Sequence, residues 1–336
     1  MKNSLLLSVT IATYKRRDLL EKSLIALSNQ TLSTELFEII VCDSLSNDGT
    51  DLMIVGFCKK YPHLKIKHVH TRNILAAKRN LGIAESSGEV VIFLDDDCIA
   101  DTEFLKNYYN LFIIESPKNI IYCGEVRFPD EWISQSNYYK FRDSRHFGSS
   151  RRQDLNKLDC KTIVVMNMAF YKNEFITKIG LVDENFVGYG CEDQDLGWRL
   201  ESKGFIIEKS KSLIVHHELS GDILGYSKKI FHTARDGMTT LLKRNPAAAS
   251  ALGFKLQLLD KDYPGQNPFK KIIFAFIRRV IFNNLMENIF SVLLMKTDNI
   301  KIFYSPGLYK YVLACAYVRG SRARQTILKN TNGWYE

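Results

Sequence analysis

The sequence predicts an α/β fold in which a mostly parallel central sheet, flanked by helices, precedes a helical C-terminal region. Strand-like and helix-like segments alternate up to residue 94, and polar side chains follow the predicted strands where they end. Helical patterns rich in basic and aromatic residues fill the chain after Gly225. With 336 residues, 46% of them hydrophobic, the chain can bury roughly 75% of its unfolded surface, which indicates one large or two modest globular domains.

The alternating segments can be followed from the N-terminus. The apolar run LLLSVTIAT (5–13) alternates and leads into the basic residues 15–17, so it predicts a first strand rather than a signal peptide. The elements predicted after it are helix 17–30, strand 37–42, helix 51–61, strand 65–70, helix 74–86 and strand 89–94. No G-x-G-x-x-G or Walker A pattern occurs, and no segment has the ~18 uninterrupted apolar residues of a membrane-spanning helix.

The pattern changes twice, so we divide the chain into 1–98, 99–224 and 225–336. The middle part is mixed, and its arginine-rich stretch FRDSRHFGSSRRQD (141–154) predicts a mobile loop. This loop is either a lid that brings arginines to a bound anion or a solvated basic loop. Its arginines are Arg142, Arg145, Arg151 and Arg152.

Cysteine content and charge narrow the possible compartments and partners. The seven cysteines are scattered without a CxxC pair, which argues against a disulfide framework or a zinc site and favours a reducing cytosol. The net charge of +9 is unevenly distributed, because residues 225–336 hold 18 Lys and Arg against 6 Asp and Glu. We therefore expect the C-terminal part to meet an anionic surface.

Two carboxylate clusters are the strongest chemical signals. Asp95, Asp96 and Asp97 directly follow the apolar strand VVIFL, and a divalent cation would relieve the repulsion among them. The alternative is a solvated helix N-cap. Glu192 and Asp193 lie in GYGCEDQDLGWRL, where the alternative role is favourable charge at a helix N-terminus. One cluster for a metal ion and one for accepting a proton would suit a metal-assisted displacement.

Four segments carry a resemblance to a known family. They are SVTIATYKRRDLLEKSLIALSNQT (8–31), FEIIVCDSLSNDGT (37–50), RNILAAKRNLGIAESSGEVVIFLDDDC (72–98) and NMAFYKNEFITKIGLVDENFVGYGCEDQDLGWRLESKG (167–204). In this order they resemble the family 2 glycosyltransferases of GT-A fold, a Rossmann-like architecture, over about residues 5–220. The resemblance implies an inverting transferase in which 1–98 binds the nucleotide-sugar and 99–224 binds the acceptor.

The resemblance also implies site residues. Asp193 would be the general base, and Asp97 and Asp95 would hold Mn²⁺ or Mg²⁺, with His216 or His217 as a further ligand. The residues implied in acceptor binding are Glu192, Asp195 and Trp198. Those implied in binding the UDP-, dTDP- or GDP-sugar donor are Thr13, Tyr14, Arg17, Asp43, Ser44, Arg72, Lys78, Arg79, Asp95 and Asp96.

The chain departs from the family pattern at one place. Ser44 stands where the family often has the second acidic residue of VDDGSTDGT, and Leu45 stands where it has Gly. The preferred nucleotide base is therefore open. The Q-x-x-R-W signature of processive synthases is absent from the sequence, which favours a single addition per encounter.

Three other functions remain as alternatives. A sugar nucleotidyltransferase would need a glycine-rich N-terminal loop, which ATYKRRD lacks. A nucleic-acid-binding protein would explain the basic C-terminal part but gives neither carboxylate cluster a role, so we expect no nucleic-acid partner. A catalytically inactive carbohydrate- or nucleotide-binding relative would not need both clusters intact.

The C-terminal segments FKKIIFAFIRRVIFNNLMENIFSVLLM (269–295) and SPGLYKYVLACAYVRGSRARQ (305–325) combine apolar, aromatic and basic residues. Such helices lie in the interface of anionic membranes. The alternatives are a helical cap on the catalytic domain or a homo-oligomer interface. We expect a cytoplasmic protein, peripheral on the inner face of the membrane, that acts on a glycan or lipid-linked glycan in O-antigen or capsule synthesis.

Overall fold

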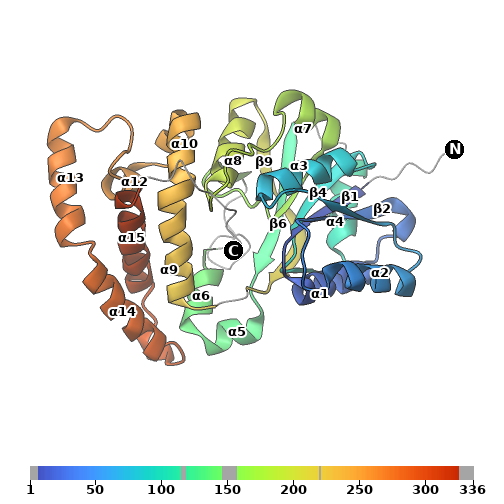
Figure 1. The fold of residues 1–336 in the computed structure, drawn as a ribbon, viewed down its shortest axis with the longest axis horizontal. Coiled ribbons are helices and arrows are strands. Elements are labelled where there is room, and N and C mark those ends of the chain that lie inside the picture. The colour runs from blue at the N-terminus through green and yellow to red at the C-terminus, as the bar shows by residue number, and fades with distance from the viewer. Residues whose placement is uncertain (1–6, 115–118, 146–156, 219–220, 325–336) are drawn as a thin grey trace.

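The computed structural model of the protein describes residues 7–114, 119–145, 157–218 and 221–324. Figure 1 shows an α/β part built around the sheet and, beside it, a group of helices formed by the C-terminal third of the chain. The predicted fold class, a central sheet flanked by helices and followed by a helical region, is confirmed.

The first four strands form a parallel ladder. β1 (Leu7–Thr13) pairs with β2 (Phe37–Asp43) on one side and β4 (Val90–Asp95) on the other, and β2 pairs with β3 (Ile66–His70). The helices between these strands are α1 (Arg17–Ser28), α2 (Thr50–Lys60) and α3 (Leu75–Glu85). All the elements expected up to residue 94 therefore form, with their ends shifted by a few residues.

β4 shows why this ladder needs helices on both faces. Val90, Ile92 and Leu94 pack into one apolar core, whereas Val91 and Phe93 pack into another. Because successive side chains of a strand point to opposite faces, an uninterrupted apolar run such as VVIFL requires cover on both sides. The two cores hold the sheet edge that carries the polar strand ends in a fixed position.

The rest of the sheet is mixed. Its order is β3-β2-β1-β4-β8-β6-β9-β5, and β7 pairs with β9. β8 runs antiparallel to both β4 and β6, and β6 runs parallel to β9. These strands are β5 (Cys98–Ala100), β6 (Ile120–Arg127), β7 (Lys157–Leu158), β8 (Asn167–Tyr171) and β9 (Ile206–His216). The helices among them are α4 (Phe104–Tyr109), α5 (Asp130–Gln135), α6 (Asn137–Asp143), α7 (Lys172–Lys178) and α8 (Glu192–Ser202).

The prediction of a mobile loop over 141–154 is wrong at its start. Residues up to Asp143 belong to α6, and the Arg142 side chain is buried beside Glu218, with Nη1 3.4 Å from Oε1. The guanidinium also lies 3.9 Å from the centre of the Tyr226 ring. A buried arginine needs such a partner, so Arg142 joins α6 to the end of the sheet instead of serving a lid. Arg151 and Arg152 lie outside the described residues, and Arg145 is exposed.

The C-terminal helices pack on one another and on the α/β part. They are α9 (Ile223–His232), α10 (Met238–Arg244), α11 (Pro246–Ala251), α12 (Phe254–Leu259), α13 (Pro268–Val280), α14 (Asn284–Lys296) and α15 (Pro306–Arg322). A π-helical segment, Thr233–Gly237, joins α9 to α10. The apolar run 269–295 is thus split into two helices between Val280 and Asn284.

Two ion pairs, of which only Arg324–Asp260 is fully buried, and a close backbone approach hold this helical group in place. Arg324 is 2.6 Å from Asp260, and Arg319 is 2.8 Å from Glu287. A Cβ atom on Gly237 would lie 2.0 Å from the carbonyl oxygen of Gly190, so only glycine allows this contact. Gly190 precedes α8, and the contact therefore ties the C-terminal helices to the loop before the second carboxylate cluster. None of the helices within the described ranges is both long and apolar enough to cross a membrane.

Candidate active site

The polar residues at the strand ends lie together because the strands are parallel. In the register of the ladder, Thr13 is opposite Asp43 and Ala12 is opposite Asp95. The carboxyl ends of parallel strands form the edge at which such sheets bind ligands. A pocket of about 40 Å³ opens there, lined by Ala12, Thr13, Tyr14, Arg16, Leu75, Lys78, Asp95 and Asp96.

The three consecutive aspartates have different sets of partners, although Arg16 contacts both Asp96 and Asp97. Asp95 lies 3.6 Å from the Arg79 guanidinium, and Asp96 accepts a hydrogen bond of 2.8 Å from the Thr13 hydroxyl. Asp97 lies 3.4 Å from Nε2 of His216. Their arrangement at the turn between β4 and β5 therefore separates the carboxylates and surrounds them with donors. Burial raises the pKa of Asp96 to about 7.

Asp97 is electrostatically different from its neighbours. Burial alone would raise the pKa of its carboxyl, but His216 and then Arg16 hold that pKa well below the usual range. Among the three aspartates, Asp97 is thus the one whose pKa is lowered, whereas the pKa values of Asp95 and Asp96 are raised. A carboxylate and an adjacent imidazole together offer an oxygen ligand and a nitrogen ligand. Mg²⁺ prefers oxygen ligands alone, whereas Mn²⁺ readily accepts such a mixed set.

Arg79 joins the two acidic clusters. Its Nη1 lies 3.2 Å from Oδ1 of Asp193, and its Nη2 lies 3.6 Å from Oδ1 of Asp95. The Arg79 side chain is 5% exposed and extends from α3, whereas Asp193 is in the first turn of α8. Residues about a hundred positions apart in the chain are thereby held around one guanidinium.

The start of α8 presents two carboxyl groups with raised pKa values. Burial raises the pKa of Asp193, and Arg79 opposes part of that rise. Burial and then the Asp193 charge raise the pKa of Glu192 to about 7. Glu192 Oε2 is buried with no hydrogen-bond partner in the described structure, and Glu192 lines a small pocket with Asn73 and Tyr189. A buried acceptor without a partner points to a ligand group that would donate to it.

The neighbouring cations Lys78 and Arg79 contact different groups. Lys78 lines the pocket at the strand ends and donates to Oδ1 of Asn73 at 2.9 Å. Burial lowers the pKa of Lys78 to about 8, although Asp96 and Asp43 act in the opposite direction. Arg79 instead bridges Asp95 and Asp193. Both cations therefore belong to the site, in different places.

Asp43 organises the turn after β2. Its carboxylate accepts hydrogen bonds from the backbone N–H groups of Ser44 and Ser46 and from the Ser46 hydroxyl. Although burial acts in the opposite direction, the nearby His68 side chain and the hydrogen bonds from Ser46 lower the pKa of Asp43 to about 2. The Ser44 hydroxyl is buried and has no hydrogen-bond partner among the residues described. Leu45, where the family has Gly, adopts a positive φ of 58° and is exposed.

Several expected site residues have their contacts away from the two carboxylate clusters or within a single helix. Arg17 is exposed and its backbone N–H donates to Asp48, while Arg72 is exposed and pairs with Glu184. Asp195 is 2.8 Å from Arg199 within α8, and its other oxygen accepts a hydrogen bond from Asn245.

Two more candidates make packing contacts. Trp198 packs against the core of the C-terminal helices. The ring of His217 lies 5.3 Å from that of Trp132, so of the histidine pair it is His216 whose side chain meets Asp97. Tyr14, by contrast, lines the pocket beneath the Lys78 ammonium, which is 5.4 Å from its ring.

Arg16 is the site residue that the sequence analysis missed. Its Nη1 lies 3.0 Å from Asp96 and 3.1 Å from Asp97. The signal was present in the run Lys15-Arg16-Arg17 after β1, but the sequence alone does not show which of three basic side chains turns toward the strand ends.

Comparisons with known proteins show which family the chain resembles. Residues 8–180 match the family model described as glycosyl transferase family 2. The chain is 25% identical over 260 residues to an uncharacterized glycosyltransferase, YfnE, of Bacillus subtilis, covering 63% of this chain and 64% of that protein. It is 29% identical over 194 residues to the GalNAc(5)-diNAcBac-PP-undecaprenol beta-1,3-glucosyltransferase of Campylobacter jejuni, covering 53% and 60%. The chain thus spans less than two thirds of the length of either relative.

A solved structure shares the fold. A mannosyltransferase of Pyrobaculum calidifontis, in complex with GDP-Man and Mn²⁺, superposes with a TM-score of 0.54 at 15% identity. The superposition covers 93% of this chain and 86% of the other. At this identity the likeness concerns the fold alone.

Proposed function

The chain belongs to glycosyl transferase family 2, and from that premise we propose that it moves a sugar from a nucleoside diphosphate donor to a hydroxyl of a glycan acceptor, with inversion of the anomeric carbon. The observation that carries the proposal is Arg79, whose one guanidinium contacts both Asp95 and Asp193. The groups proposed to bind the donor and to accept the proton thus contact the same guanidinium.

The donor would lie at the strand ends. Thr13, Tyr14, Lys78 and Asp96 line the pocket there, and the cations of Arg16 and Lys78 would meet the diphosphate. The unpartnered Ser44 hydroxyl is available for the nucleoside base, so UDP-, dTDP- and GDP-sugars are all candidates.

Asp95, Asp97 and His216 would hold Mn²⁺ or Mg²⁺, which supplies positive charge to the leaving diphosphate when bound. The neighbourhood fits such an ion because an oxygen donor, Oδ2 of Asp97, lies 3.4 Å from a nitrogen donor, Nε2 of His216. The Arg16 guanidinium contacts the same oxygen of Asp97 that His216 faces, so the chain itself already places a cation beside this carboxylate.

Asp193 would accept the proton of the attacking acceptor hydroxyl. As that proton leaves, the oxygen forms a bond to the anomeric carbon while the bond from this carbon to the diphosphate oxygen breaks. The raised pKa of Asp193 makes it a stronger base than an ordinary carboxylate, and Arg79 fixes its orientation. Glu192, with its unpartnered oxygen, would accept a hydrogen bond from the acceptor sugar.

Two further functions stay as competitors. An inactive relative would bind donor without releasing nucleotide, and a sugar nucleotidyltransferase would release pyrophosphate. The proposal is tested by following nucleotide release from UDP-, dTDP- and GDP-sugars with Mn²⁺, Mg²⁺ or EDTA, using wild type and Asp97→Ala. Metal-dependent release from one donor, lost in the variant, is the expected result. Donor binding without release in the presence of acceptor glycans would favour the inactive relative.

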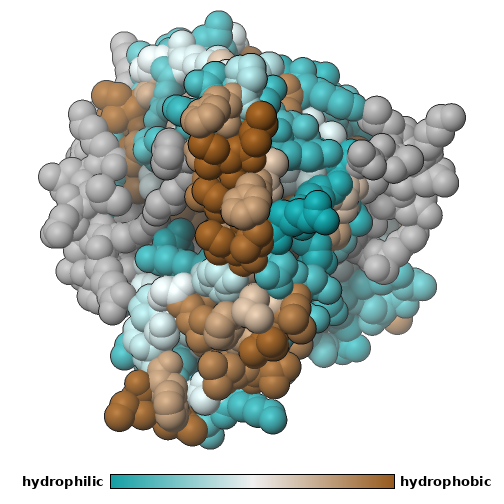
Figure 2. Space-filling view, turned by 90° about the vertical axis from the view of Figure 1, so that its left-hand side faces the viewer, coloured by the Kyte–Doolittle hydropathy of each residue, from teal (hydrophilic) through white to brown (hydrophobic). Residues whose placement is uncertain are grey.

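We further propose that the protein is peripheral on the cytoplasmic face of the membrane and acts on a lipid-linked glycan of a surface polysaccharide. The outward side of α13 carries Phe269, Ile272 and Phe276, each between 68% and 71% exposed. α14 exposes Leu285, Ile289 and Val292, and the following turn exposes Ile302. Figure 2 shows these apolar side chains as two patches on the face formed by the C-terminal helices.

The charges around this face favour anionic lipid over a second copy of the chain. Between residues 263 and 324 the acidic residues are Glu287 and Asp298, against ten Lys and Arg. Both carboxylates are occupied, Glu287 by Arg319 and Asp298 by the backbone N–H of Tyr138. A dimer through this face would bring two cationic surfaces together, whereas anionic headgroups would complement one. Flotation with anionic vesicles tests this proposal.

The acceptor is inferred from the same surface. The Campylobacter relative is named for a glycan on undecaprenol diphosphate, which is a membrane-anchored acceptor. An enzyme docked through α13 and α14 would reach such a substrate without leaving the bilayer surface.

A further inference from the structure

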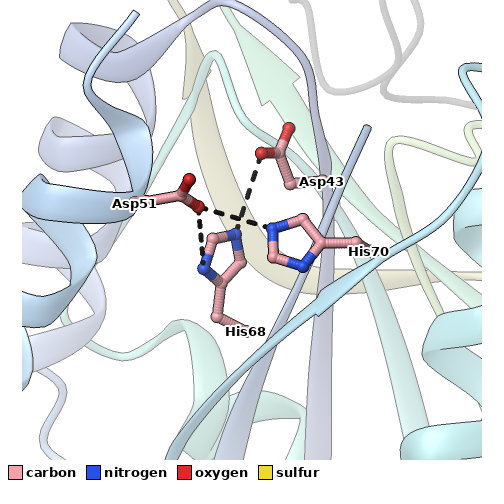
Figure 3. A group of neighbouring side chains, drawn as sticks. All are labelled: Asp43, Asp51, His68 and His70. Carbon is pink, nitrogen blue, oxygen red and sulfur yellow. Dashed lines mark hydrogen bonds and ion pairs between the residues drawn. The ribbon is translucent and has the colours of Figure 1, made fainter. Parts of the chain in front are cut away.

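A second group of metal-ligating side chains lies outside the carboxylate clusters. Asp43, Asp51, His68 and His70 each offer one ligand atom, and these atoms all lie within 4.8 Å of one another. Figure 3 shows the four side chains converging from β2, α2 and β3.

The sequence explains why they converge. His68 and His70 are two residues apart on β3, so their imidazoles project from the same face of the sheet. Asp51 is in the first turn of α2, which packs beside that face, and Asp43 ends the neighbouring strand opposite His70. Three separate elements therefore supply the group.

The distances suit a tetrahedral ion. Nε2 of His70 lies 3.4 Å and Nδ1 of His68 lies 3.6 Å from the same oxygen, Oδ1 of Asp51. Zinc bonds of about 2.0–2.1 Å to nitrogen and oxygen in tetrahedral geometry place neighbouring ligand atoms roughly 3.3–3.4 Å apart. Both distances to Asp51 are thus within a few tenths of an ångström of this spacing, and all the ligand atoms of the group lie within 4.8 Å of one another.

Asp43 supplies the support that such a histidine requires. Nε2 of His68 is buried and lies 3.8 Å from Oδ2 of Asp43, which is too far for a hydrogen bond, and it has no other hydrogen-bond partner among the described residues. Asp43 is itself held by the backbone N–H groups of Ser44 and Ser46. A carboxylate behind the second nitrogen of a metal-bound histidine fixes its tautomer and orientation.

We propose that Asp51, His68 and His70 form a three-ligand site for Zn²⁺, with Asp43 as the outer partner of His68. Two imidazoles and one carboxylate select Zn²⁺ over Mg²⁺, which prefers oxygen ligands. Asp51 is 56% exposed and His70 36% exposed, so the fourth position faces solvent and takes water. The bound ion would fasten α2 to β3.

This site differs from the Mn²⁺ or Mg²⁺ position in its residues and in its chemistry. It shares with the proposed donor pocket only Asp43, and that connection rests on the proposed function. The zinc site itself does not, because Zn²⁺ binding is measured without donor or acceptor. Failure of glycosyl transfer and failure of zinc binding are therefore distinguishable.

The test is calorimetric titration of the full chain with Zn²⁺ in excess Mg²⁺, which would compete with Zn²⁺ for the proposed position at Asp95 and Asp97. Wild type is compared with His70→Ala and with Asp51→Asn, two substitutions at exposed positions that leave the fold intact. His63→Ala is the matched control, because His63 is an exposed histidine outside the group. Thermal unfolding with and without Zn²⁺ gives a second readout.

We expect one Zn²⁺ per chain in wild type and in His63→Ala, with affinity reduced at least about 10-fold in both ligand variants. Zn²⁺ should raise the unfolding temperature of wild type and leave that of His70→Ala unchanged. Equal Zn²⁺ binding by wild type and His70→Ala would place the ion elsewhere and overturn the proposal. Absence of binding at micromolar Zn²⁺ in wild type would show that the group is an ion-pair cluster only.

Discussion

The strand-end site and the C-terminal helical face differ in which kind of side chain they bury and which kind they expose. At the strand ends, acidic and basic side chains are buried together, and Arg79 is 5% exposed between two carboxylates. On α13, apolar side chains such as Phe269 are 71% exposed. Burying charged groups and exposing apolar side chains both reduce the stability of a folded protein. Both features are explained if each region binds a ligand. This difference is what we expect if, as proposed above, one region binds a polar substrate and the other a lipid surface.

The largest effect on stability is expected at Arg79. Arg79→Gln removes the cation between Asp95 and Asp193 and leaves two partly buried carboxylates, 28% and 30% exposed, without their partner. We expect the free energy of unfolding, measured in urea, to fall by about 1–3 kcal/mol. Adding Asp193→Asn should restore part of this loss. A loss within about 0.5 kcal/mol would mean that Arg79 does not join the clusters.

The C-terminal face should respond in the opposite way. Phe269→Asp combined with Ile272→Asp places charge on exposed positions, so stability should change by no more than about 0.5 kcal/mol per substitution. Binding to vesicles with anionic lipid should nevertheless be lost, because each position contributes apolar area to the interface.

Leu181→Asp, on an exposed apolar residue of the α/β part, is the control for vesicle binding. It should float with the vesicles as wild type does. If the wild-type protein stays at the bottom of the gradient with both anionic and neutral vesicles, the proposal of membrane binding is contradicted.

Arg16 and Arg17 offer a smaller and more local comparison. Arg16 contacts Asp96 and Asp97, whereas the Arg17 side chain is exposed on α1. Calorimetry with the donor nucleotide should show affinity reduced about 10-fold in Arg16→Ala, the size of one charge-assisted contact, and unchanged in Arg17→Ala. Equal losses in the two variants would indicate long-range charge rather than contact.

The smallest expected effect is a pH dependence of stability at Glu192. Its pKa is about 7 in the folded protein, above the ordinary 4.5, so the folded state binds the proton more tightly. This stabilisation is present below pH 4.5 and is lost as the pH rises toward 7. Urea unfolding at pH 5 and pH 8 should show Glu192→Gln gaining on wild type at the higher pH, by on the order of 1 kcal/mol. A pH-independent difference would contradict the raised pKa.

Much of the fold could be predicted because hydrophobic periodicity is local. The runs that became β1, β2 and β4 are apolar and end in polar residues, which was enough to predict the edge where Asp43 and Asp95 lie. The prediction of a mobile loop over 141–154 was wrong at its start because an arginine in a polar stretch is usually exposed. The burial of Arg142 depends on Glu218, which is far along the chain.

The site was predictable in its residue types and less so in its contacts. Asp193 and Asp95 were both candidates, but their connection through Arg79 depends on how α3 and α8 pack. Asp195 and Arg199 are four residues apart on α8 and pair with each other, which a helical spacing could have indicated. His68 and His70 share a face of the strand predicted over 65–70, but the group proposed to bind Zn²⁺ could not be predicted from them alone. It also needs Asp51 from α2 and Asp43 from β2, and their approach depends on how these elements pack.

The measurement that tests the central claim most directly compares donor binding and sugar transfer in Asp193→Asn. The variant keeps the shape of the side chain and its place beside Arg79 but cannot accept the acceptor proton. We predict that donor affinity stays within about twofold of wild type while turnover falls about 10²–10⁴-fold. Wild-type turnover in Asp193→Asn would contradict the account, because the second carboxylate cluster would then have no part in the reaction.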